Sequence, residues 1–209
     1  MSTLLIFARY PELGKVKTRL AAGVGEEEAL RVYRWLLAHT QAVVEPLHKV
    51  RKLVWLAEFR DAAAQPELWA GFEQRPQPAG DLGEKMQAAF AQAFADGAPA
   101  VVIIGTDCPG LSTAHVQEAF AALHTHDLVV GPAADGGYYL LGMKRLWVEV
   151  FQQKQWSTDT VRAATLADAH RLGLRVHELP LLHDIDTADD LRRWQHTEPM
   201  TLPGGLRVL

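Results

Sequence analysis

The sequence predicts one α/β domain with a largely parallel β-sheet that is covered by helices on both faces. Two observations predict this class. Short apolar runs alternate along the chain with longer segments of helical periodicity. The 209 residues, of which 48% are hydrophobic and 22% charged, suit one sizeable core and fall short of two full domains. We place this domain at residues 1–196 and expect residues 197–209, which contain two prolines and two glycines, to form a loosely attached tail.

The first half of the chain begins with a continuous apolar run over residues 3–8, which predicts a strand buried on both faces and followed by a loop rich in cations. Next, three glutamates after Gly25 favour the start of a helix that ends near Pro46. Residues 52–57 predict a second strand. Residues 61–79 contain three prolines and are expected to be irregular.

In the second half, Asp81 and Glu84 match a capping box for a helix that stops at Gly97. Ser112 or Thr113 caps the next helix, and Thr187 with Asp190 caps the last one. Another helix is expected to open at Ser157 or Thr158 and to end near Gly173. Further strands are expected at residues 100–104, 127–130, 138–143 and 174–179.

Composition limits the partners. The net charge of −4 gives no general attraction for nucleic acid, so any anion site must be built locally. A single cysteine, Cys108, excludes an intrachain disulfide and a thiolate metal cluster. The N-terminal apolar run is short and lacks a basic leader, and no apolar segment approaches the roughly 20 residues of a membrane helix. We therefore expect a cytoplasmic protein that is not inserted in a membrane; its oligomeric state is left open.

The segment FARYPELGKVKTRL follows the first strand and carries the strongest chemical signal. Its cations repel one another unless an anion neutralises them, and in parallel sheets ligands bind beyond the carboxyl ends of the strands. Gly14 permits close approach, Thr18 offers a hydroxyl and Arg19 a planar fork for phosphate oxygens. A solvated basic loop is the alternative. The candidate phosphate contacts are Arg9, Gly14, Lys15, Lys17, Thr18 and Arg19.

Three further segments carry carboxylates. GTDCPGL ends the third predicted strand and places Asp107 where Mg²⁺ or Mn²⁺ bound to phosphates would be anchored, although Asp107 also suits a turn cap. GPAADGGYYLLGM puts Asp135 before Gly136 and Gly137, with tyrosines that can stack on a ring or a sugar; a structural hairpin would use the same glycines. DIDTADDL supplies Asp184 and Asp186, one of which completes the metal site if the last predicted strand returns beside the third. Helix capping by Asp186 or Thr187 is the competing interpretation, and the two can coexist.

Taken in order along nearly the whole chain, FARYPELGKVKTRL, GDLGEKM, GTDCPGL, GPAADGGYYLLGM, QWSTDTV and DIDTADDL resemble a family of bacterial GT-A-like glycosyltransferases associated with radical-SAM, selenodomain and arsenosugar genes. The resemblance extends more distantly to 2-phospho-L-lactate guanylyltransferase and the molybdenum cofactor nucleotidyltransferases. It implies a single-domain GT-A-like fold, that of the nucleotide-diphospho-sugar transferases, with three α/β/α layers and a mixed, mainly parallel sheet.

The same resemblance assigns roles to individual residues. Lys17 and Arg19 become the phosphate clamp, and Asp107 and Asp186 hold the divalent cation. Asp81, Gly83 and Lys85 border the base or the phosphates, while Asp135, Tyr138 and Trp156 face the acceptor together with Gly136 and Gly137.

These expectations lead to a transferase that takes a nucleotide or nucleotide sugar and a small-molecule acceptor. In glycosyl transfer, the leading hypothesis, Arg19 shares the charge of the leaving diphosphate and Asp135 is the acceptor base. Nucleotidyl transfer with release of pyrophosphate is the second hypothesis, and a non-catalytic nucleotide-binding module is the third.

Overall fold

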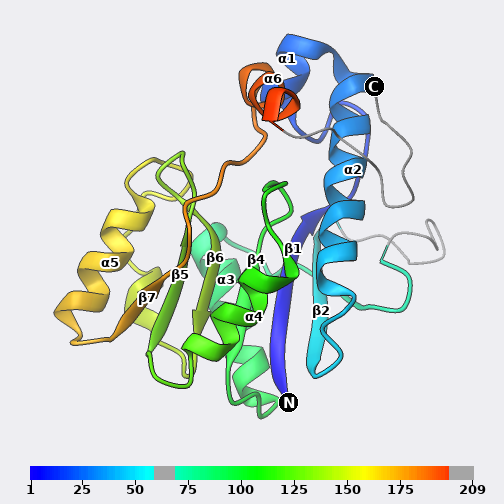
Figure 1. Ribbon diagram of the computed structural model, residues 1–209. Coiled ribbons are helices and arrows are strands. Elements are labelled where there is room, and N and C mark those ends of the chain that lie inside the picture. The colour runs from blue at the N-terminus through cyan, green and yellow to red at the C-terminus, as the bar shows by residue number, and fades with distance from the viewer. Residues whose placement is uncertain (59–68, 198–209) are drawn as a thin grey trace.

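In a computed structural model that describes residues 1–58 and 69–197, the strands form one seven-stranded sheet (Figure 1). The strands are β1 Ser2–Arg9, β2 Val50–Ala57, β3 Glu73–Pro76, β4 Val101–Ile104, β5 Leu128–Pro132, β6 Tyr138–Met143 and β7 Val176–Glu178. The helices are α1 Thr18–Val24, α2 Glu26–Val44, α3 Leu82–Ala95, α4 Thr113–Ala122, the 3-10 helix η2 Val148–Phe151, α5 Val161–Arg171 and α6 Ala188–Thr197.

The sheet is mixed and mainly parallel, in the order β3-β2-β1-β4-β6-β5-β7. Strand β1 lies between β2 and β4 and is parallel to both. Strand β6 is antiparallel to both of its neighbours, β4 and β5, whereas β7 is parallel to β5. The carboxyl ends of β1, β2 and β4 therefore meet at one edge, which is the position expected for a ligand site.

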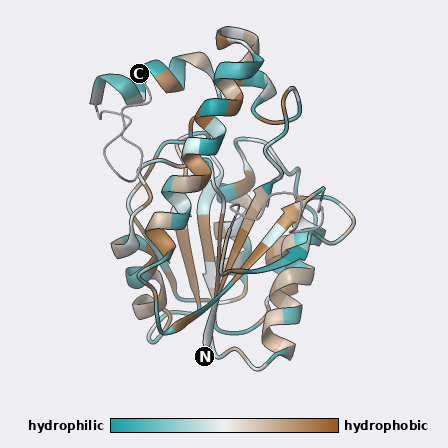
Figure 2. Ribbon diagram, turned by 90° about the vertical axis from the view of Figure 1, so that its right-hand side faces the viewer, coloured by the Kyte–Doolittle hydropathy of each residue, from teal (hydrophilic) through white to brown (hydrophobic). Residues whose placement is uncertain are grey.

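Helices cover both faces because the central strands are apolar on both sides. Leu4 and Ile6 of β1 pack in one core together with α2 and α4, while Leu5 points into a second core with α3, η2 and α5. Figure 2 shows the apolar strands enclosed between helices whose hydrophilic residues alternate with apolar ones. The three-layer α/β/α fold expected from the sequence is thus confirmed.

A third, smaller core lies beyond the carboxyl edge of the sheet. Leu20 of α1, Trp35 of α2 and Leu191 of α6 pack there with Ile185. Helices α1 and α6 approach so closely that a Cβ on Gly23 would come within 2.7 Å of the Ala188 Cβ. In Figure 1 both helices sit at the end of the sheet toward which β1 runs. This small core fixes the segments before α1 and α6 relative to each other.

Most predicted elements are present near their predicted bounds, and both capping predictions with a defined partner are confirmed. The Asp81 carboxylate accepts a hydrogen bond from Glu84 N, and the Glu84 carboxylate accepts one from Asp81 N. Thr187 and Asp190 exchange hydrogen bonds in the same way at the start of α6. Gly97 has φ +85° directly after the end of α3, as a helix stop requires.

Three predictions are wrong, and the condition set for the last strand is not met. The cation-rich loop contains α1, and the stretch expected to be irregular contains β3, although its residues 61–68 lie outside the described part. Helix α5 begins at Val161 rather than at Ser157 or Thr158, because Ser157 has φ +63° and the Thr158 hydroxyl donates back to Gln155 O. The last strand pairs with β5 rather than returning beside β4.

The expected tail lies outside the described residues from 198 onward, and α6 extends to Thr197. Within residues 1–58 and 69–197, no helix is both long and apolar enough to cross a lipid bilayer.

Candidate active site

A cleft of about 660 Å³ opens at the carboxyl edge of the sheet. Its lining comes from the ends of β1, β2 and β4, from the amino ends of α1 and α3, from β6, and from the segment before α6. Ten of the residues proposed from the sequence line it: Arg9, Lys17, Thr18, Arg19, Asp81, Lys85, Asp107, Tyr138, Asp184 and Asp186. Residues far apart in the sequence therefore converge on one surface.

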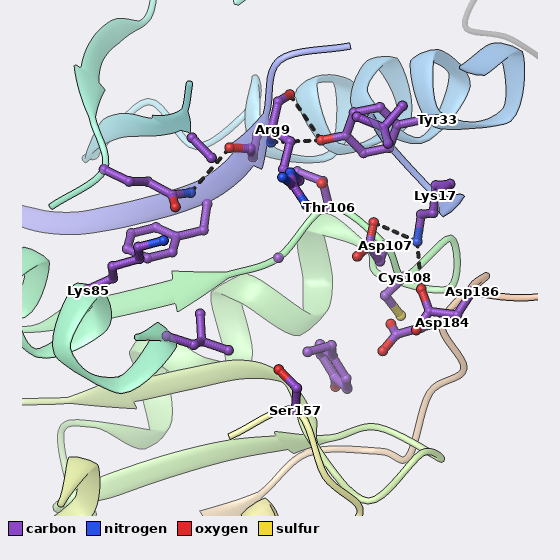
Figure 3. Close-up of a pocket in the computed structure, with 18 of the residues that line it drawn as sticks. Arg9, Lys17, Tyr33, Lys85, Thr106, Asp107, Cys108, Ser157, Asp184 and Asp186 are labelled. Atoms are coloured by element: carbon purple, nitrogen blue, oxygen red, sulfur yellow. Dashed lines mark hydrogen bonds and ion pairs between the residues drawn. The ribbon is translucent and has the colours of Figure 1, made fainter. Parts of the chain in front are cut away.

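Lys17 lies at the centre of the charged end of this cleft. Its Nζ is 2.8 Å from Asp107 Oδ1 and 2.8 Å from Asp186 Oδ1 (Figure 3). The lysine side chain is 6% exposed, whereas the two carboxylate side chains are 46% and 33% exposed. Arg19 adds a second cation, with Nη1 3.7 Å from Asp186 Oδ2. The carboxylates thus face the cleft with a buried ammonium between them.

The pKa of Lys17 follows from this arrangement. Burial by itself lowers the pKa of an ammonium, but the charges and hydrogen bonds of Asp107 and Asp186 outweigh it and hold the pKa of Lys17 above its usual value. Lys17 is therefore a cation at all physiological pH values. Its backbone is in the left-handed region, with φ +49° and ψ +44°, which is uncommon for a residue with a side chain. Such an outlier is typical of functional sites.

The segment before α6 reaches Asp107 by crossing back over the sheet after β7. Ile185 N donates a hydrogen bond of 2.9 Å to Asp107 O, which fastens the two segments together. The Asp190 carboxylate accepts from Asp186 N and Thr187 N, so the start of α6 is also held. Asp190 caps the helix, so the Asp186 carboxylate is not needed as a cap and lies in the cleft.

Asp184 is a third carboxylate in the same region. Burial raises its pKa to about 7, and the negative charges of Asp107, Asp135 and Asp186 add to the shift. The Cys108 thiol lies against it, and burial together with the Asp184 charge raises the pKa of that thiol. Cys108 is accordingly a packing residue rather than a nucleophile.

The end of β1 is sealed by side chains from other elements. The buried Tyr33 hydroxyl of α2 accepts from Arg9 N at 2.8 Å and donates to Arg9 O at 3.1 Å. Gln77 Nε2 donates to Ala8 O at 3.2 Å and to Trp55 O at 3.1 Å. Both amide hydrogens of Gln77 are then used, so its contribution to the cleft is a carbonyl acceptor.

The amino end of α3 forms another part of the lining. Asp81 is occupied as the helix cap, and Lys85 projects from the first turn into the cleft at the end away from Lys17 (Figure 3). Gly83 is buried and does not line the cleft. A Cβ at Gly83 would lie 2.3 Å from the Trp156 ring, so this glycine exists to let the indole pack on the helix.

The side chains that line the cleft from β6 and residues 152–160 are uncharged. Tyr138, Tyr139 and Ser157 contribute to the lining from this side. The turn before β6 packs on residues 158–160, since a Cβ at Gly136 would lie 2.1 Å from Asp159 O. Asp135 Oδ1 accepts from Gly137 N at 2.9 Å and is exposed at the turn. The hairpin thus supplies a structural reason for both glycines.

The remaining predicted residues lie outside the lining of this cleft: Gly14, Lys15, Gly83, Asp135, Gly136, Gly137 and Trp156. Lys15 is paired on the surface with Glu12, with Nζ 2.9 Å from Oε1. Sequence reasoning missed Tyr33, Gln77 and Thr106, which all line the cleft. The signal for Thr106 was available, because it directly precedes Asp107 after β4.

Asp107 and Asp186 are the residues of the cleft that could hold a divalent cation together with phosphates. One carboxylate oxygen of Asp107 and one of Asp186 face each other across the Lys17 ammonium, and each lies 2.8 Å from its nitrogen. In the part of the chain that the structure describes, no group of three or more His, Cys, Asp or Glu residues is arranged to hold a metal ion by itself. Two carboxylates with phosphate oxygens completing the shell are typical of Mg²⁺ sites.

Comparison with known proteins places the chain in a family. Residues 39–158 match the family described as "Uncharacterized protein conserved in bacteria (DUF2064)". The chain belongs to the DUF2064 family. A crystal structure from Desulfovibrio desulfuricans G20, described as a "putative nucleotide-diphospho-sugar transferase", is 35% identical and superposes with a TM-score of 0.88 over 94% of this chain and 87% of that one. A search of curated proteins gives no match.

More distant structures share the fold of this DUF2064 protein. CMP:2-keto-3-deoxy-manno-octonic acid synthetase in complex with CTP is 10% identical, with a TM-score of 0.59 over 94% of this chain and 98% of that one. A manganese complex of Rv0371C from Mycobacterium tuberculosis is 16% identical, with a TM-score of 0.55 over 95% of this chain and 100% of that one. The nucleotide-diphospho-sugar transferase fold expected from the sequence is thus established.

Proposed function

We propose that this protein is a metal-dependent glycosyltransferase that uses a nucleotide-diphosphate sugar as donor. The observation that carries the proposal is the Lys17, Asp107 and Asp186 cluster, with Arg19 beside it, at the carboxyl edge of the sheet. Cations and carboxylates that alternate on one cleft wall suit a diphosphate together with its divalent cation. The names of the structural relatives, which include a nucleotide-diphospho-sugar transferase and a manganese complex, support this choice.

In this mechanism Asp107 and Asp186 would hold Mg²⁺ or Mn²⁺, and the ion would neutralise charge on the departing diphosphate. Lys17, Thr18 and Arg19 contact the phosphates from the start of α1. Arg9, Gln77, Asp81 and Lys85 border the rest of the nucleotide from the ends of β1 and β2 and from α3. An acceptor oxygen forms a bond to the anomeric carbon as the bond from that carbon to the diphosphate breaks.

The acceptor proton must pass to a base. Asp135, expected in this role from the sequence, caps a turn outside the cleft lining, whereas Asp184 lines the cleft. We therefore propose Asp184 as the base, on geometry, with Tyr138, Tyr139 and Ser157 facing the acceptor. Trp156, Gly136 and Gly137 then support this wall by packing behind it rather than by touching the acceptor.

Nucleotidyl transfer is the second candidate, and the charge of the acceptor wall disfavours it. An acceptor phosphate would need cations of its own, but the lining from β6 and residues 152–160 is neutral and the neighbouring side chain is the Asp184 carboxylate. A neutral hydroxyl acceptor suits that wall better.

Thermal unfolding against a panel of nucleotide-diphosphate sugars and nucleoside triphosphates, each with and without Mn²⁺, tests the proposal. A ligand at 100 times its Kd stabilises a protein by about 2.7 kcal/mol, which is readily measured. We expect stabilisation by a nucleotide sugar that requires the metal. A shift with triphosphates alone would support nucleotidyl transfer, and a flat response to the whole panel would contradict both.

A further inference from the structure

The Lys17 ammonium occupies the point that a divalent cation shared by Asp107 and Asp186 would occupy. It is 2.8 Å from one oxygen of each carboxylate, and Figure 3 shows it between them. A lysine ammonium is a compact point charge, so it can take the place of a metal ion between two carboxylates. One of the two negative charges is therefore already offset by Lys17 in the protein without ligands, and Arg19 lies 3.7 Å from Asp186.

The backbone holds the ammonium in this place. Lys17 adopts φ +49° at the N-cap of α1, an unfavourable conformation for a side-chain residue, and its hydroxyl-free side chain makes no capping hydrogen bond. Leu20 anchors the following turn in the small core that also contains Ile185 and Leu191. The surrounding packing thus fixes the backbone of Lys17 beside the two aspartates and leaves the torsions of its side chain to decide where the ammonium lies.

A second cation at the same carboxylates would be repelled by Lys17. Unit charges 4 Å apart interact by about 1 kcal/mol even in bulk water, and a divalent ion doubles that term, so the ammonium lowers metal affinity by at least about tenfold. The phosphates of a nucleotide reverse the balance, because they attract the ammonium and add oxygen ligands for the metal.

We propose that Lys17 is a placeholder cation that makes metal binding depend on the nucleotide. Without nucleotide, Lys17 stands between Asp107 and Asp186, offsets part of their negative charge and keeps metal affinity low. When a diphosphate arrives, the ammonium turns to its oxygens and releases the carboxylates for the metal. This inference rests on the proposed function and adds an order to it: nucleotide and metal enter together, and the metal does not bind first.

The test is titration of the full chain with MnCl₂ alone, with bound Mn²⁺ followed by electron paramagnetic resonance. Lys17→Met removes the charge, and Lys17→Gln removes it while keeping a hydrogen-bond donor for the carboxylates. Lys15→Met is the matched control, since Lys15 belongs to the same segment but pairs with Glu12 outside the cleft. Circular dichroism verifies that each variant is folded.

We expect both Lys17 variants to bind Mn²⁺ at least about tenfold more tightly than the wild type and Lys15→Met to match the wild type. Equal or weaker binding by a folded Lys17 variant would overturn the placeholder, as would an equal gain in Lys15→Met. If the placeholder fails while a nucleotide sugar still stabilises the wild type only with Mn²⁺, the proposed function stands. If that metal-dependent stabilisation is also missing, both fail.

Discussion

The two walls of the cleft are built in different ways. The wall formed by the end of β1, the start of α1 and the segment before α6 is charged, and its ion pair between Lys17 and Asp186 joins residues 169 positions apart. The wall formed by β6 and residues 152–160 presents neutral side chains and is held by tight packing, Trp156 on Gly83 and Asp159 on Gly136. The first wall suits diphosphate chemistry, and the second suits recognition of a neutral acceptor.

This difference predicts two separable kinds of defect. Changes in the charged wall remove nucleotide and metal binding and leave much of the packing intact. Changes behind the neutral wall disturb stability and acceptor use first, because packing rather than charge holds that wall in position.

The largest effect is expected from Asp107→Ala in the charged wall. The variant removes a proposed metal ligand and should weaken Mn²⁺-dependent nucleotide-sugar binding by more than about 100-fold, because loss of even an outer partner of a metal site costs 10- to 100-fold. Isothermal titration calorimetry with the nucleotide sugar, in the presence and absence of Mn²⁺, measures this affinity. Asp189→Asn, an exposed aspartate of α6, is the control and should bind normally. Unchanged affinity in Asp107→Ala would remove the metal role.

The next largest effect is expected behind the neutral wall. Gly83→Ala places a methyl group 2.3 Å from the Trp156 ring, and such overpacking destabilises a protein by about 1–3 kcal/mol. Urea denaturation should show this loss, and adding Trp156→Phe should recover part of it. Gly105→Ala, whose Cβ would meet nothing within 4 Å, is the matched control. A Gly83→Ala variant as stable as the wild type would show that the Trp156 ring does not pack tightly on α3 at Gly83.

Gln77, which lies beside the end of β1, tests whether the nucleotide extends beyond the charged wall. Gln77→Ala removes the acceptor that faces the cleft and leaves Ala8 O and Trp55 O without their donor. We expect nucleotide affinity to fall about tenfold, the value of one well-placed hydrogen bond. Gln77→Glu should bind more weakly still, since its negative charge would face both the Ala8 and Trp55 carbonyl oxygens and the phosphates of the nucleotide. Full affinity in both variants, measured by calorimetry, would place the nucleotide elsewhere.

The smallest effect concerns a charge cluster outside both walls. Arg175 N, Lys144 and the Arg175 guanidinium hold the pKa of Asp127 well below its usual range. A depressed pKa contributes stability above the unfolded value of about 3.9 and loses it as the pH falls further. Asp127→Asn should therefore cost up to about 1 kcal/mol near pH 7, because the partners are exposed and screened. The difference from wild type should shrink on acidification below pH 4; a constant difference would exclude the ionic origin.

The parts of the fold that were predictable from the sequence are those with local causes. The β1 run, the Asp81–Glu84 capping box and the stop at Gly97 each depend on neighbouring residues. Helix α1 escaped prediction because it has seven residues and its N-cap, Lys17, makes no side-chain cap. The start of α5 was misplaced because Ser157 has a left-handed backbone, with φ +63°, and the sequence around it gives no signal of that conformation.

The site residues that were predictable from the sequence are likewise those whose position has a local cause. Lys17, Arg19 and Asp107 were predictable because they follow strands whose carboxyl ends share one edge. The approach of Asp186 was expected for a wrong reason: β7 lies at the far edge, and the segment after it crosses back to bond with Asp107 O. Gln77 follows the short edge strand β3 in a proline-rich segment, where no periodicity marked a functional residue.

The most direct test of glycosyl transfer is phosphorus NMR, combined with mass spectrometry of the acceptors, of the protein incubated with Mg²⁺, an acceptor mixture and the nucleotide sugar that stabilises it most. The account predicts a nucleoside diphosphate that accumulates with a matching glycosylated acceptor and disappears with Asp107→Ala. Free pyrophosphate formed from a nucleoside triphosphate, with the nucleotide sugar left intact, would contradict it.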